Sequence, residues 1–128
     1  MFRKITSVLV VQDIEPVLPF WEAIGFRKTV EVPHGNRLGF VILEGDGVQL
    51  MYQTIDSVRD DEKGVLDGPR PIEAGALFIE VEDVDALSKR IPPGTGVIVQ
   101  RRTTFYGATE TIVRDPAGNV VTFAQMQK

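Results

Sequence analysis

The sequence contains no cysteine and only one histidine, His34. The absence of cysteine excludes disulfide bonds, thiolate zinc sites and cysteine nucleophiles. His34 falls in a predicted turn, so none of the serines is expected to have a histidine that activates it as a nucleophile. We therefore predict no catalytic residue of the nucleophile–histidine type.

Long apolar runs and basic clusters are also missing. No apolar stretch approaches the ~18 residues that cross a bilayer. Lys and Arg number 14 against 18 Asp and Glu, which gives a formal net charge of −4. Residues 1–7 lack the long apolar core of a signal peptide. We therefore expect a cytoplasmic protein that binds neither membranes nor nucleic acid.

The order of predicted elements is strand, helix and three strands, and this order occurs twice in the 128 residues. A first helix is expected at the apolar positions between Val17 and Ile24, and a second over residues 84–91, with Asp13 and Asp83 as their N-caps. Alternation and β-branched residues predict strands over residues 5–11, 26–32, 38–43, 48–54, 76–81, 97–100, 104–114 and 120–126. A turn is expected over residues 33–36.

This repetition indicates two modules. The tetrapeptide at 11–14 (VQDI) matches the one at 81–84 (VEDV) at an offset of 70 residues. We predict a first βαβββ module over 1–54, a linker or flap over 55–72, and a second βαβββ module over 73–128. The predicted fold is α+β, an open, cupped mixed sheet with the helices on its convex side, all within one structural domain.

Three segments carry a resemblance to a known family. They are residues 11–26 (VQDIEPVLPFWEAIGF), 106–110 (YGATE) and 114–123 (RDPAGNVVTF). Together they resemble the vicinal oxygen chelate superfamily, which includes glyoxalase I, ring-cleaving dioxygenases, thiol transferases and bleomycin-resistance proteins. The segment 106–110 is most similar to the bleomycin-resistance branch.

The resemblance implies where a divalent metal would be held, namely at one position on each of four strands. In this sequence these positions are Thr6, Gln49, Ala76 and Thr122. Such a metal needs imidazole nitrogen or carboxylate oxygen. Because none of the four residues supplies either, we predict that the protein holds no metal and needs no cofactor.

Strand parity predicts what lines the space between the modules instead. The predicted ligand-binding residues are Thr6, Val8, Gln49, Met51, Gln53, Ala76, Phe78, Thr122 and Ala124, together with Tyr106 and Glu110. They describe a mostly apolar cleft with a few neutral polar groups, which is typical of a small-molecule pocket. The opposite parity is expected under the helices and comprises Leu9, Val11, Leu50, Leu77, Ile79, Val121 and Phe123.

Several of these residues have a purely structural alternative. Gln49 either orients a ligand or bonds to Thr6 or Thr122, while Phe78 and Met51 either support a ligand or fill the core. Tyr106 either stacks on a ligand or lies at the rim with a solvated hydroxyl. Glu110 either binds a cationic group or, as we favour, pairs with one of Arg101, Arg102 and Arg114.

The predicted function is stoichiometric capture of a small, largely aromatic or apolar molecule, such as an antibiotic, without a metal. The resemblance implies a homodimer, and the acidic net charge favours a cationic ligand. One alternative is a metal-independent enzyme of the same superfamily with Glu110 or Glu80 as general base. Another is a catalytically silent interaction protein whose side chains fill the cleft.

Overall fold

The chain forms two compact units, Met1–Ile72 and Glu73–Lys128. The structure is a computed structural model and describes residues 1–61 and 75–127. The first unit contains β1 (Val8–Val11), the 3-10 turn η1 (Glu15–Val17), α1 (Leu18–Ala23), β2 (Arg27–His34), β3 (Arg37–Gly45), β4 (Val48–Thr54) and α2 (Ile55–Asp61). The second contains β5 (Ala76–Glu80), α3 (Val84–Ser88), β6 (Gly96–Thr103), β7 (Ala108–Arg114) and β8 (Val120–Met126).

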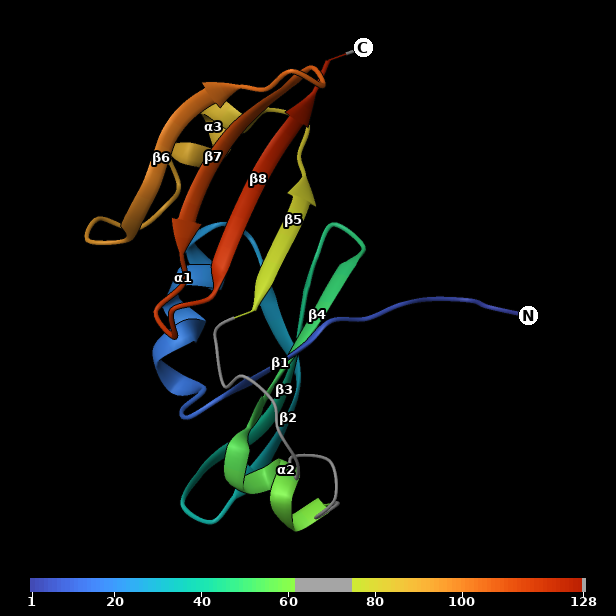
Figure 1. The fold of residues 1–128 in the computed structure, drawn as a ribbon. Helices are drawn as coiled ribbons and strands as arrows, with labels where there is room; N and C mark the ends of the chain where they lie inside the picture. The colour runs from blue at the N-terminus through green and yellow to red at the C-terminus, as the bar shows by residue number, and fades with distance from the viewer. Residues whose placement is uncertain (62–74, 128) are drawn as a thin grey trace, which may run out of the picture. The chain divides into compact units, whose positions relative to one another are not determined.

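Each unit has its own four-stranded mixed sheet, and the two sheets share one topology (Figure 1). The strand order is β1-β4-β3-β2 in the first and β5-β8-β7-β6 in the second. In both, the first and last strands of the unit pair in parallel, and the other pairs are antiparallel. The predicted α+β fold of two βαβββ modules is therefore confirmed, and it explains the repeat seen in the sequence.

The two predicted helix caps have different outcomes. Asp83 caps α3 as predicted, because its Oδ1 accepts a hydrogen bond of 3.0 Å from the backbone N–H of Ala86. Asp13 is not a cap: η1 begins after Ile14, and no side chain caps it. The carboxylate of Asp13 instead pairs with Arg37 at the start of β3. Asp13 therefore bonds to a charged side chain that is distant in the sequence, and not to a backbone N–H of the following turn.

Several strand boundaries differ from the prediction, since β3 extends to Gly45 rather than residue 43 and β6 to Thr103 rather than residue 100. β1 begins at Val8 rather than at residue 5. β2 continues through His34, and the turn comprises residues 35 and 36, where Gly35 has a φ of +68°. β7 begins at Ala108 rather than at residue 104, because residues 105–107 form the turn of the β6–β7 hairpin. Hairpin geometry, which needs the positive φ of +81° at Gly107, takes precedence there over the β propensity of the threonines.

The start of the predicted linker is helical. Residues Ile55–Asp61 form α2, and the side chain of Val58 is buried. α2 contacts β1, β3 and β4, so it belongs to the first unit. The rest of the predicted linker or flap, residues 62–72, lies outside the described residues. In the part of the chain that the structure describes, no helix is long and apolar enough to cross a membrane.

Burial alternates along β3 and β4 in the first sheet and along β5 and most of β8 in the second, and this alternation separates a covered face from an open face, whereas β7 is buried on both faces. The covered-face prediction holds for five residues that are at most 8 % exposed, namely Leu9, Val11, Leu50, Val121 and Phe123. Leu77 and Ile79 are of intermediate exposure. In the first unit the core gathers around Trp21, whose indole Nε1 donates to the hydroxyl of Tyr52 at 2.8 Å.

Candidate functional site

The open face of the first sheet is largely apolar. Strand register places its residues in two rows across all four strands, Val8–Met51–Ile42–Val30 and Val10–Gln53–Phe40–Val32. The four valines are each between 39 % and 48 % exposed. Val8, Met51 and Gln53 are predicted ligand-binding residues, whereas the contribution of β2 and β3 was missed. The same period-two alternation in residues 30–42 would have indicated it.

The polar side chains of this face hydrogen-bond to one another. Gln49 accepts a 2.7 Å hydrogen bond from Lys4 Nζ and donates one of 2.6 Å to Glu44. These partners differ from the expected Thr6 and Thr122. Gln53 donates to Ser57 Oγ at 3.1 Å, on the first turn of α2. Thr6 precedes β1 and is of intermediate exposure.

The open face of the second sheet carries five of the other six predicted site residues, and the sixth, Tyr106, lies in the β6–β7 turn. Its rows are Ala76–Val120–Arg114, Phe78–Thr122–Ile112 and Glu80–Ala124–Glu110–Arg102. Phe78 is 53 % exposed, so it is not a core residue of its unit. Ala124 is fully buried. Their role in binding a ligand remains a prediction.

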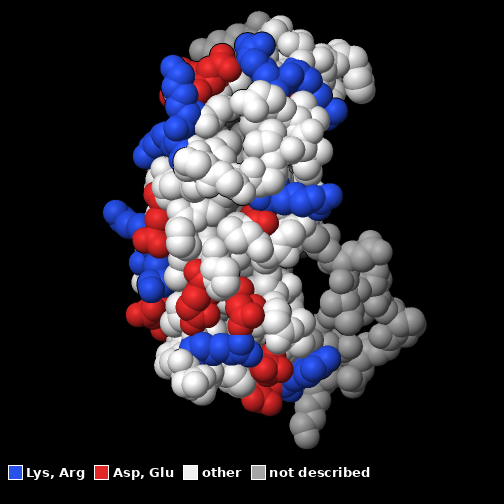
Figure 2. Space-filling view, turned by 90° about the vertical axis from the view of Figure 1, so that its left-hand side faces the viewer, with Lys and Arg blue, Asp and Glu red and all other residues white. Residues whose placement is uncertain are grey.

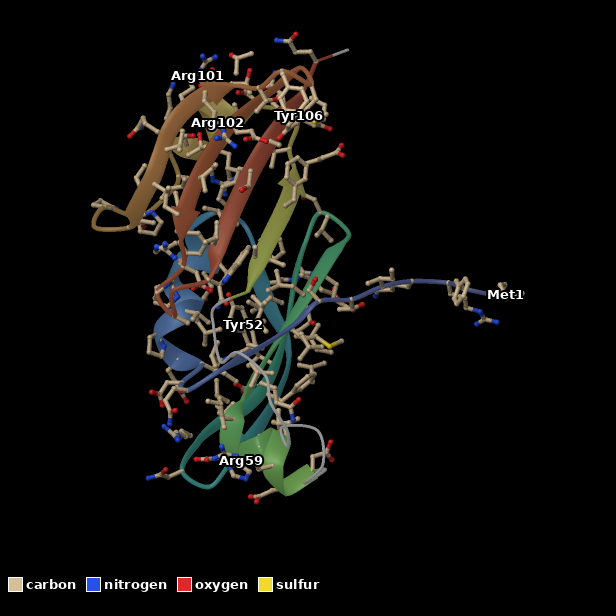
Figure 3. All side chains as sticks on the ribbon, viewed as in Figure 1. Met1, Tyr52, Arg59, Arg101, Arg102 and Tyr106 are labelled. Carbon is tan, nitrogen blue, oxygen red and sulfur yellow. The ribbon has the colours of Figure 1, made fainter. Side chains whose placement is uncertain are left out.

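Three side chains of the second unit form one connected cluster, which we call the Arg102–Glu110–Tyr106 triad. Nε and Nη2 of Arg102 both lie 2.9 Å from Oε1 of Glu110. The Tyr106 hydroxyl donates to Oε2 of the same carboxylate. Glu110 is 1 % exposed, while the side chain of Arg102 is 51 % exposed. Figure 3 shows Arg102 and Tyr106 near each other at the hairpin end of this sheet.

The β6–β7 hairpin builds this triad. Its register places Arg102 directly opposite Glu110, on the same face of the sheet. Thr104 Oγ1 accepts from the backbone N–H of Ala108 at 3.0 Å and so closes the turn that carries Tyr106. The predicted pairing of Glu110 with an arginine is therefore present, and the partner is Arg102. The hydroxyl of Tyr106 donates to this carboxylate, which differs from the alternative of a rim tyrosine with a solvated hydroxyl, and its stacking on a ligand stays a prediction.

Hydrogen bonding within the triad changes the pKa of Tyr106. The carboxylate of Glu110 accepts a hydrogen bond from the phenolic hydroxyl, and its negative charge lies beside any phenolate that forms. This contact raises the pKa of Tyr106 above its ordinary value, and desolvation acts in the same direction. Tyr106 is therefore a neutral hydrogen-bond donor throughout the physiological pH range, and its ring remains 46 % exposed.

The four positions implied for a metal do not fit one. Gln49 is the only one with a carboxamide, and Lys4 and Glu44 already engage it. Register places Phe78, not Ala76, directly beside Thr122, and neither side chain offers a ligand atom. Among the described residues, no group of three or more His, Cys, Asp or Glu is placed to hold a metal ion. We therefore derive no chemistry through a metal.

Charges of both signs are interspersed on the molecular face in Figure 2. Arg37 pairs with Asp13 and Asp56, and Arg101 pairs with Asp85. This mixture differs from the single-sign basic stripe that binds nucleic acid. A pocket at the turn end of the first sheet was not predicted from the sequence, and it is lined by Gly25, Arg27, Glu44, Gly45, Asp46 and Gly47.

Comparison with known proteins identifies the fold family. Residues 4–123 match the profile of the Glyoxalase/Bleomycin resistance protein/Dioxygenase superfamily. No curated protein sequence matches the chain. Among solved structures, TioX from Micromonospora sp. ML1 superposes with a TM-score of 0.76 at 17 % identity, covering 97 % of this chain and 100 % of that one.

Two further structures superpose over nearly the whole chain. A bleomycin-binding protein complexed with bleomycin has a TM-score of 0.69 at 15 % identity, covering 98 % of this chain and 100 % of its own. A lactoylglutathione lyase from Agrobacterium tumefaciens has a TM-score of 0.74 at 16 % identity, covering 96 % and 92 %. At these identities the similarity establishes the fold, which hosts both a binding protein and an enzyme.

Proposed function

Because the chain belongs to the glyoxalase/bleomycin resistance protein/dioxygenase superfamily, we propose that it binds a small, largely aromatic or apolar molecule without a metal ion. The molecule is captured stoichiometrically and leaves unchanged. An antibiotic is the ligand class we propose to test first, and the biological role would then be resistance in the cytoplasm.

The observation that carries this proposal is the composition of the two open faces. Valine, methionine and phenylalanine side chains stand half-exposed on them, between sparse polar groups such as Gln53 and Thr122. Apolar walls with a few polar anchors are the usual form of a small-molecule site. Burial of a ligand against them stabilises the complex by about 25 cal/mol per Å² of apolar surface. The four metal positions, by contrast, supply no metal ligand set.

A similar fold is known with a captured antibiotic, since one neighbour is a bleomycin-binding protein complexed with bleomycin. The ligand of this chain need not be bleomycin, because 15 % identity does not carry a binding specificity. The neighbour supports the type of function, capture of a small molecule, rather than the compound.

We also propose that the protein is a homodimer. Val8, Val10 and Phe78 leave much apolar surface exposed on the single chain, and a second copy would cover part of it. Analytical ultracentrifugation tests this directly. A monomer at all accessible concentrations would contradict the dimer without affecting the proposed capture of a ligand.

A metal-independent enzyme is the second candidate, and the geometry bears on its proposed bases. Both carboxylate oxygens of Glu110 are already engaged, one by Arg102 and one by Tyr106. Glu80 is exposed to solvent, so it does not lie in a water-excluding site. A general base needs a free oxygen near the proton that it removes. Capture therefore explains the site better than catalysis.

The test is a thermal-unfolding titration of the purified protein. Zn²⁺, Ni²⁺, Mn²⁺ and EDTA are added first, and bleomycin and other aromatic antibiotics are then added to separate samples. A ligand at 100 times its Kd stabilises the folded state by about 2.7 kcal/mol, which raises Tm by several degrees. We expect a shift from an aromatic compound and none from the metals.

Two matched variants localise the effect. Tyr106→Ala is expected to weaken the ligand-induced shift, whereas Phe105→Ala, which removes the adjacent and fully exposed ring, is expected to preserve it. A metal-induced shift reversed by EDTA would overturn the metal-free proposal. If no compound shifts Tm, the result would favour a catalytically silent interaction protein. Turnover of a compound would favour a metal-independent enzyme.

A further inference from the structure

The Arg102–Glu110–Tyr106 triad determines what charge the second open face offers to a ligand. The net charge of the whole chain, −4, favours a cation. Locally, however, the acid of the triad is not available. Glu110 is 1 % exposed, and its two oxygens are bonded to Arg102 and Tyr106. A cationic ligand would have to displace one of these partners from a buried carboxylate, at a large desolvation cost.

The guanidinium of Arg102 is only partly used. Its contacts to Glu110 involve Nε and Nη2, and within the described residues Nη1 has no hydrogen-bond partner. Half of the side chain is exposed. The planar fork of arginine matches a carboxylate in a bidentate geometry, and here its orientation is set in advance by a buried acid. Pre-orientation reduces the entropy lost when a second anion binds.

An aromatic ring lies next to this cationic edge. Tyr106 and Arg102 bond to the same carboxylate, that of Glu110. The phenol hydroxyl and the guanidinium therefore both lie beside this carboxylate. The ring also packs edge-on against Phe105, with 5.2 Å between the centroids. A flat aromatic ligand can therefore stack on Tyr106 while an attached anionic group reaches Arg102.

The opposite edge of the same face carries the opposite charge. Glu80 begins the row Glu80–Ala124–Glu110–Arg102, three strands away from Arg102. Three strand spacings correspond to about 14 Å. Between them lie the small side chain of Ala124 and, one row away, Thr122 and Phe78. The face is thus polarised, with its cationic end at β6 and its anionic, aromatic end at β5.

We infer that the triad selects an aromatic carboxylate, with the carboxylate on the free edge of Arg102, the ring on Tyr106 and the apolar remainder directed toward Phe78. This inference rests on the proposed function, since it names the ligand class of the same site. It reverses the sign that the net charge of the chain suggests, because Arg102 neutralises the buried carboxylate of Glu110 and keeps an exposed cationic edge.

A matched set of ligands tests it. Naphthalene-2-carboxylate, naphthalene-2-carboxamide and 2-naphthylmethylammonium share one ring system and differ in charge. Isothermal titration of the full chain with each gives three dissociation constants. We expect the carboxylate to bind about tenfold more tightly than the amide, and the ammonium compound to bind more weakly than both.

Variants of two adjacent arginines provide the control. Arg102→Gln removes the guanidinium of the triad and is expected to abolish the preference for the carboxylate. Arg101→Gln removes an equal charge from the neighbouring residue, whose side chain pairs with Asp85 on α3, and is expected to retain the preference. Because Arg102→Gln leaves Glu110 without its cation, Arg102→Lys is the second variant. It keeps the ion pair but not the fork, and it is expected to reduce the preference severalfold.

The outcomes separate this inference from the proposed function. Equal affinities for the three compounds, or tightest binding of the ammonium compound, would overturn the inference while the capture of aromatic ligands stands. No binding of any of the three would also overturn it, and the antibiotic titration would then decide the proposed function independently. Loss of the preference in Arg101→Gln as well as Arg102→Gln would overturn it, because general charge would then suffice.

Discussion

The two units share one strand order but are stabilised by different chemistry. The first unit fills its core with aromatic rings, as Trp21 contacts Phe20, Phe26 and Tyr52 at centroid distances of 5.2, 5.0 and 6.4 Å. The second unit buries polar groups: Thr109, Glu110, Thr111, Asp115 and Asn119 are all at most 9 % exposed. A single topology therefore tolerates either solution, provided that every buried polar group finds a partner.

This difference also separates the roles of the open faces. The first face presents valines and Met51, whose packing is non-directional and tolerates ligands of many shapes. The second face presents an arginine and a tyrosine held by a buried acid. Directional groups on a rigid support give specificity, whereas apolar surface gives affinity. The two open faces therefore offer different surfaces to a ligand, an apolar and unselective one in the first unit and a selective one in the second.

The largest effect is expected from the aromatic core of the first unit. Trp21→Ala removes a fully buried indole and its hydrogen bond to Tyr52, and we expect it to lower the free energy of unfolding by about 3–5 kcal/mol. Urea denaturation followed by far-ultraviolet circular dichroism measures this. Trp21→Phe should cost clearly less. A loss below about 1.5 kcal/mol for the alanine variant would mean that the aromatic cluster is not what stabilises this unit.

The polar core of the second unit is tested at the β7–β8 turn. Asp115 accepts from the backbone N–H groups of Ala117 and Asn119 and from the side chain of Asn119, which in turn accepts from the backbone N–H of Gly75. We expect Asp115→Ala to cost about 3 kcal/mol in a urea melt, because buried donors lose a charged acceptor. Asp46→Asn, in the exposed β3–β4 turn of the first unit, should change stability by less than about 0.5 kcal/mol. Equal effects at both turns would refute the distinction between the units.

The triad gives a smaller, pH-dependent effect. Glu110→Gln weakens the hydrogen bond to the Tyr106 hydroxyl, which is the main cause of the raised pKa, and removes the neighbouring charge, so we expect the tyrosine to titrate nearer its ordinary value of about 10. A near-ultraviolet absorbance titration of the two proteins measures the shift. In the unmodified protein the raised pKa of Tyr106 favours folding below pH ~10, and this contribution disappears as the pH rises through the folded-state pKa. An unchanged tyrosine titration in Glu110→Gln would show that the carboxylate of Glu110 is not what raises the pKa of Tyr106.

The smallest effect distinguishes two acids at equivalent positions of the repeat. Asp83→Ala removes the N-cap of α3 and should cost about 1 kcal/mol. Asp13→Ala removes an exposed pair with Arg37, so we expect a loss of less than about 1 kcal/mol that shrinks as salt is added. Urea melts at low and high ionic strength provide the measurement. A salt-sensitive cost at Asp83 would show that the cap acts mainly through charge.

Sequence patterns predicted the fold because local signals agreed with it. The strands predicted over residues 48–54 and 120–126 begin and end at the same residues as β4 and β8. Asp83 was identified as a cap because a cap is a contact between residues three apart in the chain. The same inference was wrong at Asp13, because Arg37 is distant in the sequence and no local pattern indicates it.

The candidate site was predictable in its faces but not in its contacts. Parity placed Val8, Met51 and Phe78 on the open faces, since side-chain direction in a strand follows from position alone. The partners of Gln49 were not predictable, because Lys4 lies 45 residues away and precedes the first strand. The sequence offered three arginines as partners of Glu110, and only the hairpin register selected Arg102.

The sequence alone determined the number of modules and the order of their elements along the chain, because these depend on periodicity and residue type, which are local. Its resemblance to the vicinal oxygen chelate superfamily implied the four metal positions, at which Thr6, Gln49, Ala76 and Thr122 supply no metal-ligand set. The tertiary structure alone decided that Glu110 is buried, that Arg102 rather than Arg101 or Arg114 neutralises it, and that Tyr106 shares its carboxylate. Register and burial arise from pairing between strands, and a difference of one residue in register would have turned Arg102 to the other face of the sheet.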